Sequence, residues 1–170
     1  MRNKTLVFKI FLSLLLVSIF LAFDLLTKEF IYGKVVATGD DIIVIKGVLE
    51  FTHAENTGAA WSIFRGQSYY LGIFSLVLSA AFLVTLLCLT NYRYSSIRFA
   101  LTLIVGGALG NCVDRLRLEY VRDFLNYAFI DFPISNIADT ELVIGLALLI
   151  LSILIIYKPF QITKKQPLPN

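Results

Sequence analysis

Four long apolar runs most constrain what this chain can fold into. They cover residues 6–23, 69–89, 99–113 and 142–157, and the second and fourth contain no charged residue. A helix needs about 20 apolar residues to cross the hydrocarbon of a bilayer. Of the 170 residues, 58% are hydrophobic and only 16% are charged, so no room remains for a large water-soluble domain. The sequence predicts a polytopic α-helical membrane protein, a single domain with four transmembrane helices at about residues 6–26, 69–90, 97–115 and 140–157.

The first run has a rival interpretation as a cleaved signal peptide, because Arg2 and Lys4 precede it. Its apolar core is long for a signal peptide, and the segment 21–24 (Leu-Ala-Phe-Asp) is a poor match to a small-x-small cleavage site. We therefore expect a membrane anchor.

The distribution of charge predicts the orientation in the membrane. Four spans place both termini on one side, and all twelve acidic residues fall on the other side. Lysine and arginine are enriched in cytoplasmic segments. We therefore expect a multi-pass protein of the cytoplasmic (inner) membrane whose two termini are cytoplasmic, on the side that receives the basic residues Arg2, Lys4, Lys9, Arg93, Arg98, Lys158, Lys164 and Lys165.

Several classes of function are excluded or disfavoured by composition. The net charge of +3 is small and no basic patch is interleaved with aromatics, which argues against a nucleic-acid partner. Cys88 and Cys112 lie within apolar runs and form no C-x-x-C motif. His53 is the only histidine, so no paired-histidine zinc motif exists, and it is expected to be a packed or interfacial residue rather than a base. We predict no metal and no cofactor.

Two polar stretches are expected on the outer side, at residues 30–67 and 116–141. In the first, residues 42–44 and 48–51 are β-branched or apolar, and Lys46-Gly47 between them is typical of a turn. A connection of this length with strands of its own is usually functional. We predict a small β-hairpin, a cradle over residues 30–67.

Polar residues gather near the outer ends of the spans. The topology brings six of them to a similar depth, and ionisable groups so close to hydrocarbon are functional by default. Two occur in the same pattern, Asn-x-x-Asp, which ends the third span and begins the fourth. Residues three apart lie on the same face of a helix, so each asparagine can hydrogen-bond to the groups that its aspartate contacts and orient them. The six residues are Asp24, Asn111, Asp114, Asp123, Asn136 and Asp139.

Structural explanations compete with functional ones at these helix ends. Asn136 is a good N-cap and Asp139 in the first turn complements the helix dipole. Asp114, in a last turn, opposes the dipole, so a structural pair with neighbouring Arg115 or Arg117 is expected.

The same competition applies elsewhere. Asp123 lies in an alternating, extended-looking segment and could be an ordinary loop acid, while Asp24 and Lys28 are spaced for an i,i+4 salt bridge. Ser62 and Lys28 are residue types that form serine–lysine hydrolase pairs, but their spacing in the sequence does not predict that they lie close together. Two converging carboxylates are better suited to catalysis, because they share one proton near neutral pH.

The motifs together resemble those of the lipoprotein signal peptidase (signal peptidase II) family. They follow one another around the four spans as Asp24-Leu-Leu-Thr-Lys28, Asn56-Thr-Gly58-Ala-Ala-Trp61, Gly110-Asn111-Cys-Val-Asp114-Arg115, Val121-Arg-Asp123-Phe124 and Asn136-Ile-Ala-Asp139. The resemblance covers almost the whole chain. It implies a bacterial inner-membrane aspartic endopeptidase that cleaves diacylglyceryl-modified prolipoproteins on the N-terminal side of the lipidated cysteine.

The resemblance also implies roles for individual residues. The catalytic pair would be Asp123 and Asp139, at the periplasmic face; the residues alone do not choose Asp123 over Asp114. The substrate would be held or the site supported by Asn56, Gly58, Asn111, Asp114, Arg115, Asn136, Asp24 and Lys28. Implied partners are the prolipoprotein, membrane lipid and globomycin-like cyclic peptide inhibitors, with a monomeric enzyme and no cofactor.

Four positions depart from the family pattern. Glu119 replaces a usual glycine, Arg122 a small apolar residue, Ser135 a phenylalanine and Trp61 a phenylalanine. Arg122 beside Asp123 is expected to favour the ionised form of that aspartate. The main alternative function is a small transporter or proton relay that uses the outer-face carboxylates, and a non-enzymatic scaffold is a third; a transporter predicts polar residues deep in the spans, where the sequence has few.

Overall fold

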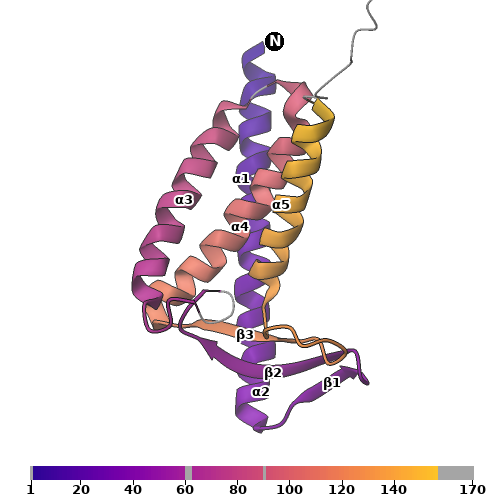
Figure 1. Cartoon of the computed structure of the whole chain (residues 1–170). Helices are drawn as coiled ribbons and strands as arrows, with labels where there is room; N and C mark the ends of the chain where they lie inside the picture. The colour runs from indigo at the N-terminus through magenta and orange to yellow at the C-terminus, as the bar shows by residue number, and fades with distance from the viewer. Residues whose placement is uncertain (1, 60–62, 90, 157–170) are drawn as a thin grey trace, which may run out of the picture.

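The computed structural model describes residues 2–59, 63–89 and 91–156, and it consists of a helix bundle with a small sheet at one end (Figure 1). Its long helices are α1 (Arg2–Thr27), α3 (Ser68–Cys88), α4 (Ser95–Leu118) and α5 (Ile137–Ile156). A π-helical turn (Lys28–Tyr32) continues α1 into α2 (Gly33–Thr38), and a 3-10 turn (Tyr92–Tyr94) precedes α4. Four helical segments are long and apolar enough to cross a membrane, which confirms the predicted fold class: Leu6–Thr38, Ser68–Cys88, Ser95–Leu118 and Ile137–Ile156.

Helix α4 lies at the centre of the bundle, with α1, α3 and α5 packed around it (Figure 1). Of its most apolar window, 72% is buried, against 11 to 17% for the other three spans. Close approach is possible because small residues lie at the contacts. A Cβ on Gly107 would come within 2.5 Å of the Ala138 carbonyl oxygen, so only glycine lets the start of α5 lie this near α4.

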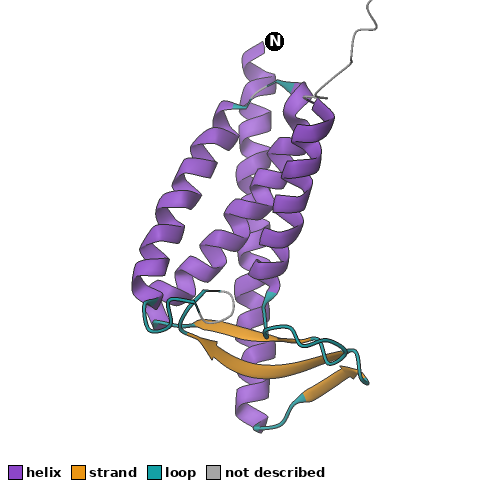
Figure 2. Ribbon diagram, viewed as in Figure 1, coloured by secondary structure: helices purple, strands orange, loops and turns teal. Residues whose placement is uncertain are grey.

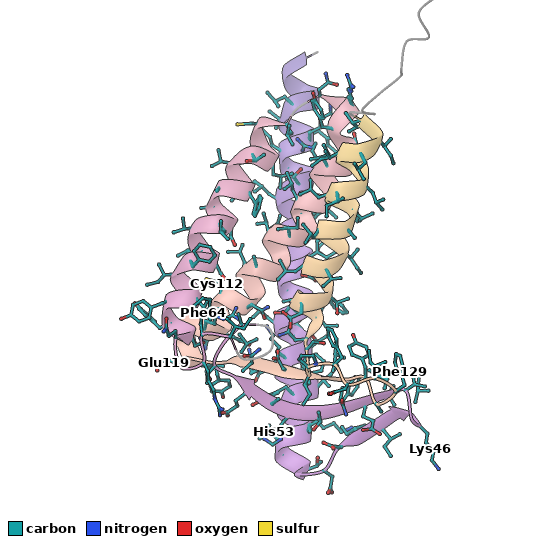
Figure 3. The ribbon with its side chains drawn as sticks, in the orientation of Figure 1. Lys46, His53, Phe64, Cys112, Glu119 and Phe129 are labelled. Carbon is teal, nitrogen blue, oxygen red and sulfur yellow. The ribbon has the colours of Figure 1, made fainter. Side chains whose placement is uncertain are left out.

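The sheet is antiparallel in the order β1 (Ile42–Ile45), β2 (Leu49–Asn56) and β3 (Val121–Asn126) (Figure 2). The predicted hairpin is therefore present, with Gly47 at positive φ in its turn. Lys46 lies at the tip of the hairpin, far from the helices (Figure 3). The extended segment that contains Asp123 adds a third strand, in which Ala54 of β2 faces Asp123.

The segment after β3 returns along that strand and leads into α5. The Ser135 carbonyl accepts hydrogen bonds from the backbone N–H groups of Phe124 (2.8 Å) and Leu125 (2.7 Å), and the Ser135 N–H donates to the Leu125 carbonyl at 3.1 Å. This backbone pairing fixes Asn136, the next residue, beside β3. The side chain at position 135 adds nothing to it, because each bond uses backbone atoms.

Two features differ from the sequence-based expectation. The segment from residue 30, expected to belong to the cradle, continues as helix to Thr38, so the cradle proper begins at β1. Glu119, which replaces a usual glycine, follows α4 at φ +64°, in the left-handed region that favours glycine (Figure 3). The chain reverses there and enters β3. Trp61, Ser62 and Tyr157 lie outside the described residues.

Candidate active site

Asp123 on β3 and Asp139 at the start of α5 lie at the end of the helix bundle that the sheet covers. Asp123 lies on β3 with 1% of its surface exposed, and Asp139 is half-buried in the first turn of α5. Each carboxylate is held by side-chain amides. Asp123 accepts hydrogen bonds from Nδ2 of Asn136 at 2.6 Å and from Nδ2 of Asn56 at 3.1 Å. Asp139 accepts one from Nδ2 of Asn111 at 2.7 Å.

Asn136 joins the two aspartates. Asn136 is the N-cap of α5. Its Oδ1 accepts a hydrogen bond from the Asp139 N–H at 2.9 Å, and the Asp139 carboxylate accepts one from the Asn136 N–H at 3.3 Å. The N-cap role predicted for Asn136 is therefore present, and the bond from Asp139 makes the cap reciprocal. The Nδ2 group of the same side chain donates to Asp123 and, at 3.0 Å, to Oδ1 of Asn111. Asn136 therefore both caps α5 and positions the side chains of Asp123 and Asn111.

Asn111 is held in turn by a buried lysine. Oδ1 of Asn111 accepts a hydrogen bond from Nζ of Lys28 at 3.0 Å. That ammonium is fully buried and pairs with Asp24 at 2.8 Å and with Asp114 at 3.4 Å. With Oδ1 occupied by donors, the Asn111 amide must direct its Nδ2 toward Asp139. The predicted Asp24–Lys28 pair is present, and its burial makes it part of the site's support.

Asp24 also ties α1 to α5 and α4. Its Oδ1 accepts a hydrogen bond from the Ala138 N–H at 2.9 Å. This N–H lies in the first turn of α5, where backbone donors have no partner within the helix. The carboxylate lies directly against α4 at Gly110, where an added Cβ would come within 2.3 Å of Oδ2. Glycine at position 110 is therefore required for the buried pair to fit.

Asp114 has a different arginine partner from the two expected. Its carboxylate accepts bonds from the Arg122 guanidinium, the shortest at 2.8 Å, and from the Arg122 N–H at 3.1 Å, instead of pairing with Arg115 or Arg117. The Arg122 guanidinium also forms an ion pair with the Glu29 carboxylate at 3.2 Å. The expectation that Arg122 acts on Asp123 is therefore wrong: neighbouring side chains on a strand point to opposite faces, and Arg122 is directed to Asp114.

Arg115 instead binds the segment after β2. Its Nη2 donates to the Gly58 carbonyl at 3.1 Å, while the Gly58 N–H donates to Oδ1 of Asn56 at 3.0 Å. The positive charge of Arg115 also interacts electrostatically with both aspartates. All ten site residues expected from sequence thus belong to one connected group: Asp24, Lys28, Asn56, Gly58, Asn111, Asp114, Arg115, Asp123, Asn136 and Asp139.

The environment of Asp123 favours its protonated form. Burial, and then the negative charge of Asp139, raise the pKa of Asp123 from an ordinary 3.8 to about 7, against the opposing effect of the two asparagine donors. A carboxyl group with this pKa is protonated in about half of the molecules at pH 7. The pair can therefore present one acid and one base at once.

The surfaces next to the two aspartates differ in chemistry. Beside Asp139, an apolar pocket of about 320 Å³ lies between α5 and the β3–α5 connection. Phe129, on that connection, is one of the lining residues (Figure 3). Beside Asp123, a polar pocket of about 410 Å³ is lined by Asn56, Glu55 and Arg65. A chain that crosses the pair would have an apolar segment on one side and a polar segment on the other.

One buried carboxylate escaped the sequence analysis. Glu141 on α5 is 5% exposed, and neither of its carboxyl oxygens has a hydrogen-bond partner among the described residues. The sequence places Glu141 at the end of the outer stretch 116–141, and its burial depends on tertiary contacts that local spacing does not reveal. No group of three His, Cys, Asp or Glu residues in the described part of the chain is arranged to hold a metal ion.

The fold and this group of residues define a multi-span membrane protein with a shielded carboxylate pair at one end of its bundle. The signal peptidase (SPase) II family model matches residues 16–155. The chain is 41% identical to the lipoprotein signal peptidase of Lactobacillus johnsonii, over 78% of this chain and 85% of that protein. It is 38% identical to the lipoprotein signal peptidase of Lactococcus lactis subsp. lactis, over 84% of this chain and 93% of that protein.

A solved bacterial membrane enzyme has a similar structure, with a TM-score of 0.75, 32% identity and coverage of 92% of this chain and 94% of that one. The chain therefore belongs to the signal peptidase II family, and it is a membrane-embedded peptidase.

Proposed function

We propose that this peptidase removes the signal peptide from diacylglyceryl-modified prolipoproteins by cutting N-terminal to the lipidated cysteine, with Asp123 and Asp139 as its catalytic pair. The observation that carries the proposal is the shared contact with Asn136, whose amide donates to Asp123 at 2.6 Å while its backbone and Oδ1 cap Asp139. Two carboxyl groups held together in this way supply the acid and the base that amide hydrolysis needs.

The roles of the two aspartates follow from their surroundings. Asp139, half-buried and next to the open apolar pocket, takes a proton from water, and the water oxygen bonds to the scissile carbonyl carbon. Asp123, with its raised pKa, donates its proton to the carbonyl oxygen. The C–N bond then breaks, the cysteine nitrogen takes the proton from Asp139, and Asp123 recovers its own. No covalent intermediate forms.

Neighbouring donors stabilise the charge that develops during the reaction. The Arg115 guanidinium, held by the Gly58 carbonyl, interacts with both aspartates and stabilises the negative charge that builds up on the carbonyl oxygen before Asp123 completes its proton transfer. Asn56 and Asn111 fix the orientation of the two carboxylates through Nδ2. Such groups lower the barrier because they need no reorganisation when charge appears.

The apolar pocket suits the hydrophobic end of a signal peptide. It opens on α5, whose Val143 and Ile144 line its membrane-facing wall. A substrate helix that enters laterally from the bilayer would place its last apolar residues there, while its acyl chains remain in lipid. Acyl chains held in the bilayer supply binding energy away from the reacting bond, which accounts for a requirement for the lipidated cysteine.

The proposed orientation places both termini in the cytoplasm and the sheet on the outer face of the bacterial cytoplasmic membrane. Every acidic residue lies in segments 24–55 and 114–141, and basic residues predominate at the other end. The enzyme acts as a monomer, and globomycin-like cyclic peptides inhibit it by occupying the substrate's place. The transporter alternative gains no support, because the second span has no charged residue and the fourth has charges only in its first turns.

The test uses the purified full chain in lipid with a diacylglyceryl prolipoprotein, and the same substrate with an unmodified cysteine as its matched control. Mass spectrometry of the products identifies the bond that is cut. We expect a new N-terminus at the lipidated cysteine and no cleavage of the unmodified chain. Equal cleavage of both substrates, or a cut elsewhere, would overturn the proposed specificity.

A further inference from the structure

The end of the bundle opposite the aspartates contains a buried arginine that pairs with no acidic side chain of the described residues. Arg98 on α4 is 8% exposed, and its guanidinium is surrounded by neutral acceptors. It donates to the Lys9 carbonyl of α1 at 2.7 Å, to the Leu86 carbonyl of α3 at 3.3 Å, and also to the Leu89 carbonyl and the Ser13 hydroxyl. It thereby joins three helices, and its positive charge remains uncompensated by these contacts.

No acidic side chain of the sequence can reach this arginine. The twelve Asp and Glu residues all lie within segments 24–55 and 114–141. The acid nearest to Arg98 along α4 is Asp114, which at a rise of about 1.5 Å per residue is about 24 Å away. Among the described residues no ion pair joins Arg98 to a carboxylate. A buried cation is costly without a counter-ion, and no Asp or Glu side chain supplies one here, so an anion from outside the chain would lower this cost.

A cavity next to Arg98 has room for such an anion. It lies between α1 and α4, has a volume of about 460 Å³, and is lined by both charged and apolar side chains. Lys9 and Arg98 provide positive charge. Ser13, Ser95 and Thr102 also line the cavity, where the Ser13 and Thr102 hydroxyls donate to the Lys9 and Phe99 carbonyls. Phe8, Leu12, Leu16 and Phe99 complete the wall with a surface that matches an acyl chain.

We propose that this cavity binds an anionic phospholipid, with the phosphate beside Arg98 and Lys9 and an acyl chain along the apolar wall. Basic pockets between membrane helices select anionic headgroups in this way. A free phosphate would satisfy the charge but leave the apolar wall uncovered, so a lipid is the better occupant. The bound lipid would hold α1 against α4 at the end distant from the site. The inference does not depend on the peptidase reaction.

Native mass spectrometry of the full chain tests this, with phosphatidylglycerol and phosphatidylcholine of identical acyl chains added in equal amounts. The informative variant is Lys9→Gln, because it removes one charge and keeps the backbone carbonyl that Arg98 uses. The matched control is Lys46→Gln, which removes the same charge at the hairpin tip (Figure 3). Thermal unfolding with each lipid, or with inorganic phosphate alone, supplies a second readout.

We expect preferential retention of phosphatidylglycerol, a loss of about fivefold in Lys9→Gln, and no loss in Lys46→Gln. Phosphatidylglycerol, but not inorganic phosphate, should raise the unfolding temperature of the wild type. Equal retention of the two lipids, or equal loss in the two variants, would overturn the proposal. A rise in unfolding temperature with phosphate alone equal to that with the lipid would also overturn it, because the cavity would then bind a free anion.

Discussion

Replacement of Gly110 by alanine is expected to disrupt the buried charge network that supports the aspartates. The new methyl carbon would lie 2.3 Å from Oδ2 and 2.9 Å from Cγ of Asp24. Neither the α4 backbone nor the carboxylate can yield cheaply, because Asp24 also accepts a hydrogen bond from the Ala138 N–H and pairs with Lys28 at 2.8 Å. Separation of the pair would leave the fully buried Lys28 short of one counter-ion.

The size of the effect follows from these contacts. Overpacking a tight site costs about 1–3 kcal/mol, and removal of one partner from a buried ion pair costs about 3–5 kcal/mol. Asp114 remains as a second partner of Lys28, at 3.4 Å. We therefore expect the free energy of unfolding to fall by about 3 kcal/mol, the lower end of the ion-pair range. That corresponds to a fall of roughly 10 °C in unfolding temperature. Cleavage should also slow, because Lys28 orients Asn111 and Asn111 orients Asp139.

Gly33→Ala is the matched control. Gly33 is also helical, and nothing lies within 4 Å of the position its Cβ would take. Alanine there should be neutral or stabilise the protein by about 0.5–1 kcal/mol. Thermal unfolding in detergent and prolipoprotein cleavage should be measured for both variants. The reasoning is refuted if Gly110→Ala unfolds at the same temperature as Gly33→Ala and cleaves at the wild-type rate.

Three further predictions follow from single residues. The pKa of Asp123 is raised to about 7, so it loses its proton as the pH rises past 7; kcat/KM should therefore fall above about pH 7, and a flat profile to pH 9 would contradict its role as the acid. Glu141→Met removes two buried oxygens without partners and should raise stability by about 1–3 kcal/mol in thermal unfolding, whereas Glu141→Gln, which keeps polar atoms, should not. Glu119→Gly relieves a left-handed backbone at φ +64° and should stabilise the fold by about 1 kcal/mol, with no gain for Glu119→Ala.

The parts of this structure that depend on local spacing could be predicted from the sequence. Apolar runs of membrane length gave the four spans, because hydrocarbon thickness fixes how long such a run must be. The i,i+4 pair of Asp24 and Lys28 and the capping of α5 by Asn136 involve residues within one helical turn. Their function as supports for the aspartates depends on burial, which local spacing does not reveal.

The parts that depend on tertiary contacts could not be predicted. Local spacing predicts an adjacent arginine as the partner of Asp114, but the chain reverses at Glu119 and places Arg122 against Asp114 instead. Nothing in the residues alone distinguished Asp123 from Asp114 as the partner of Asp139, and the family motif was needed to choose it. Asp123 and Asp139 are linked through Asn136, because the pairing of β3 with Ser135 places Asn136 beside Asp123.

The most direct test of the account is the single-turnover rate of prolipoprotein cleavage by Asp123→Asn, Asp139→Asn and Asp41→Asn. Each change replaces a carboxylate by an isosteric amide, and Asp41 is an exposed control before β1. With folding verified by thermal unfolding, we expect the first two variants to lose about 10³-fold or more in rate and Asp41→Asn to match the wild type. A folded Asp123→Asn or Asp139→Asn enzyme that cleaves within tenfold of the wild-type rate would contradict the assignment of the catalytic pair.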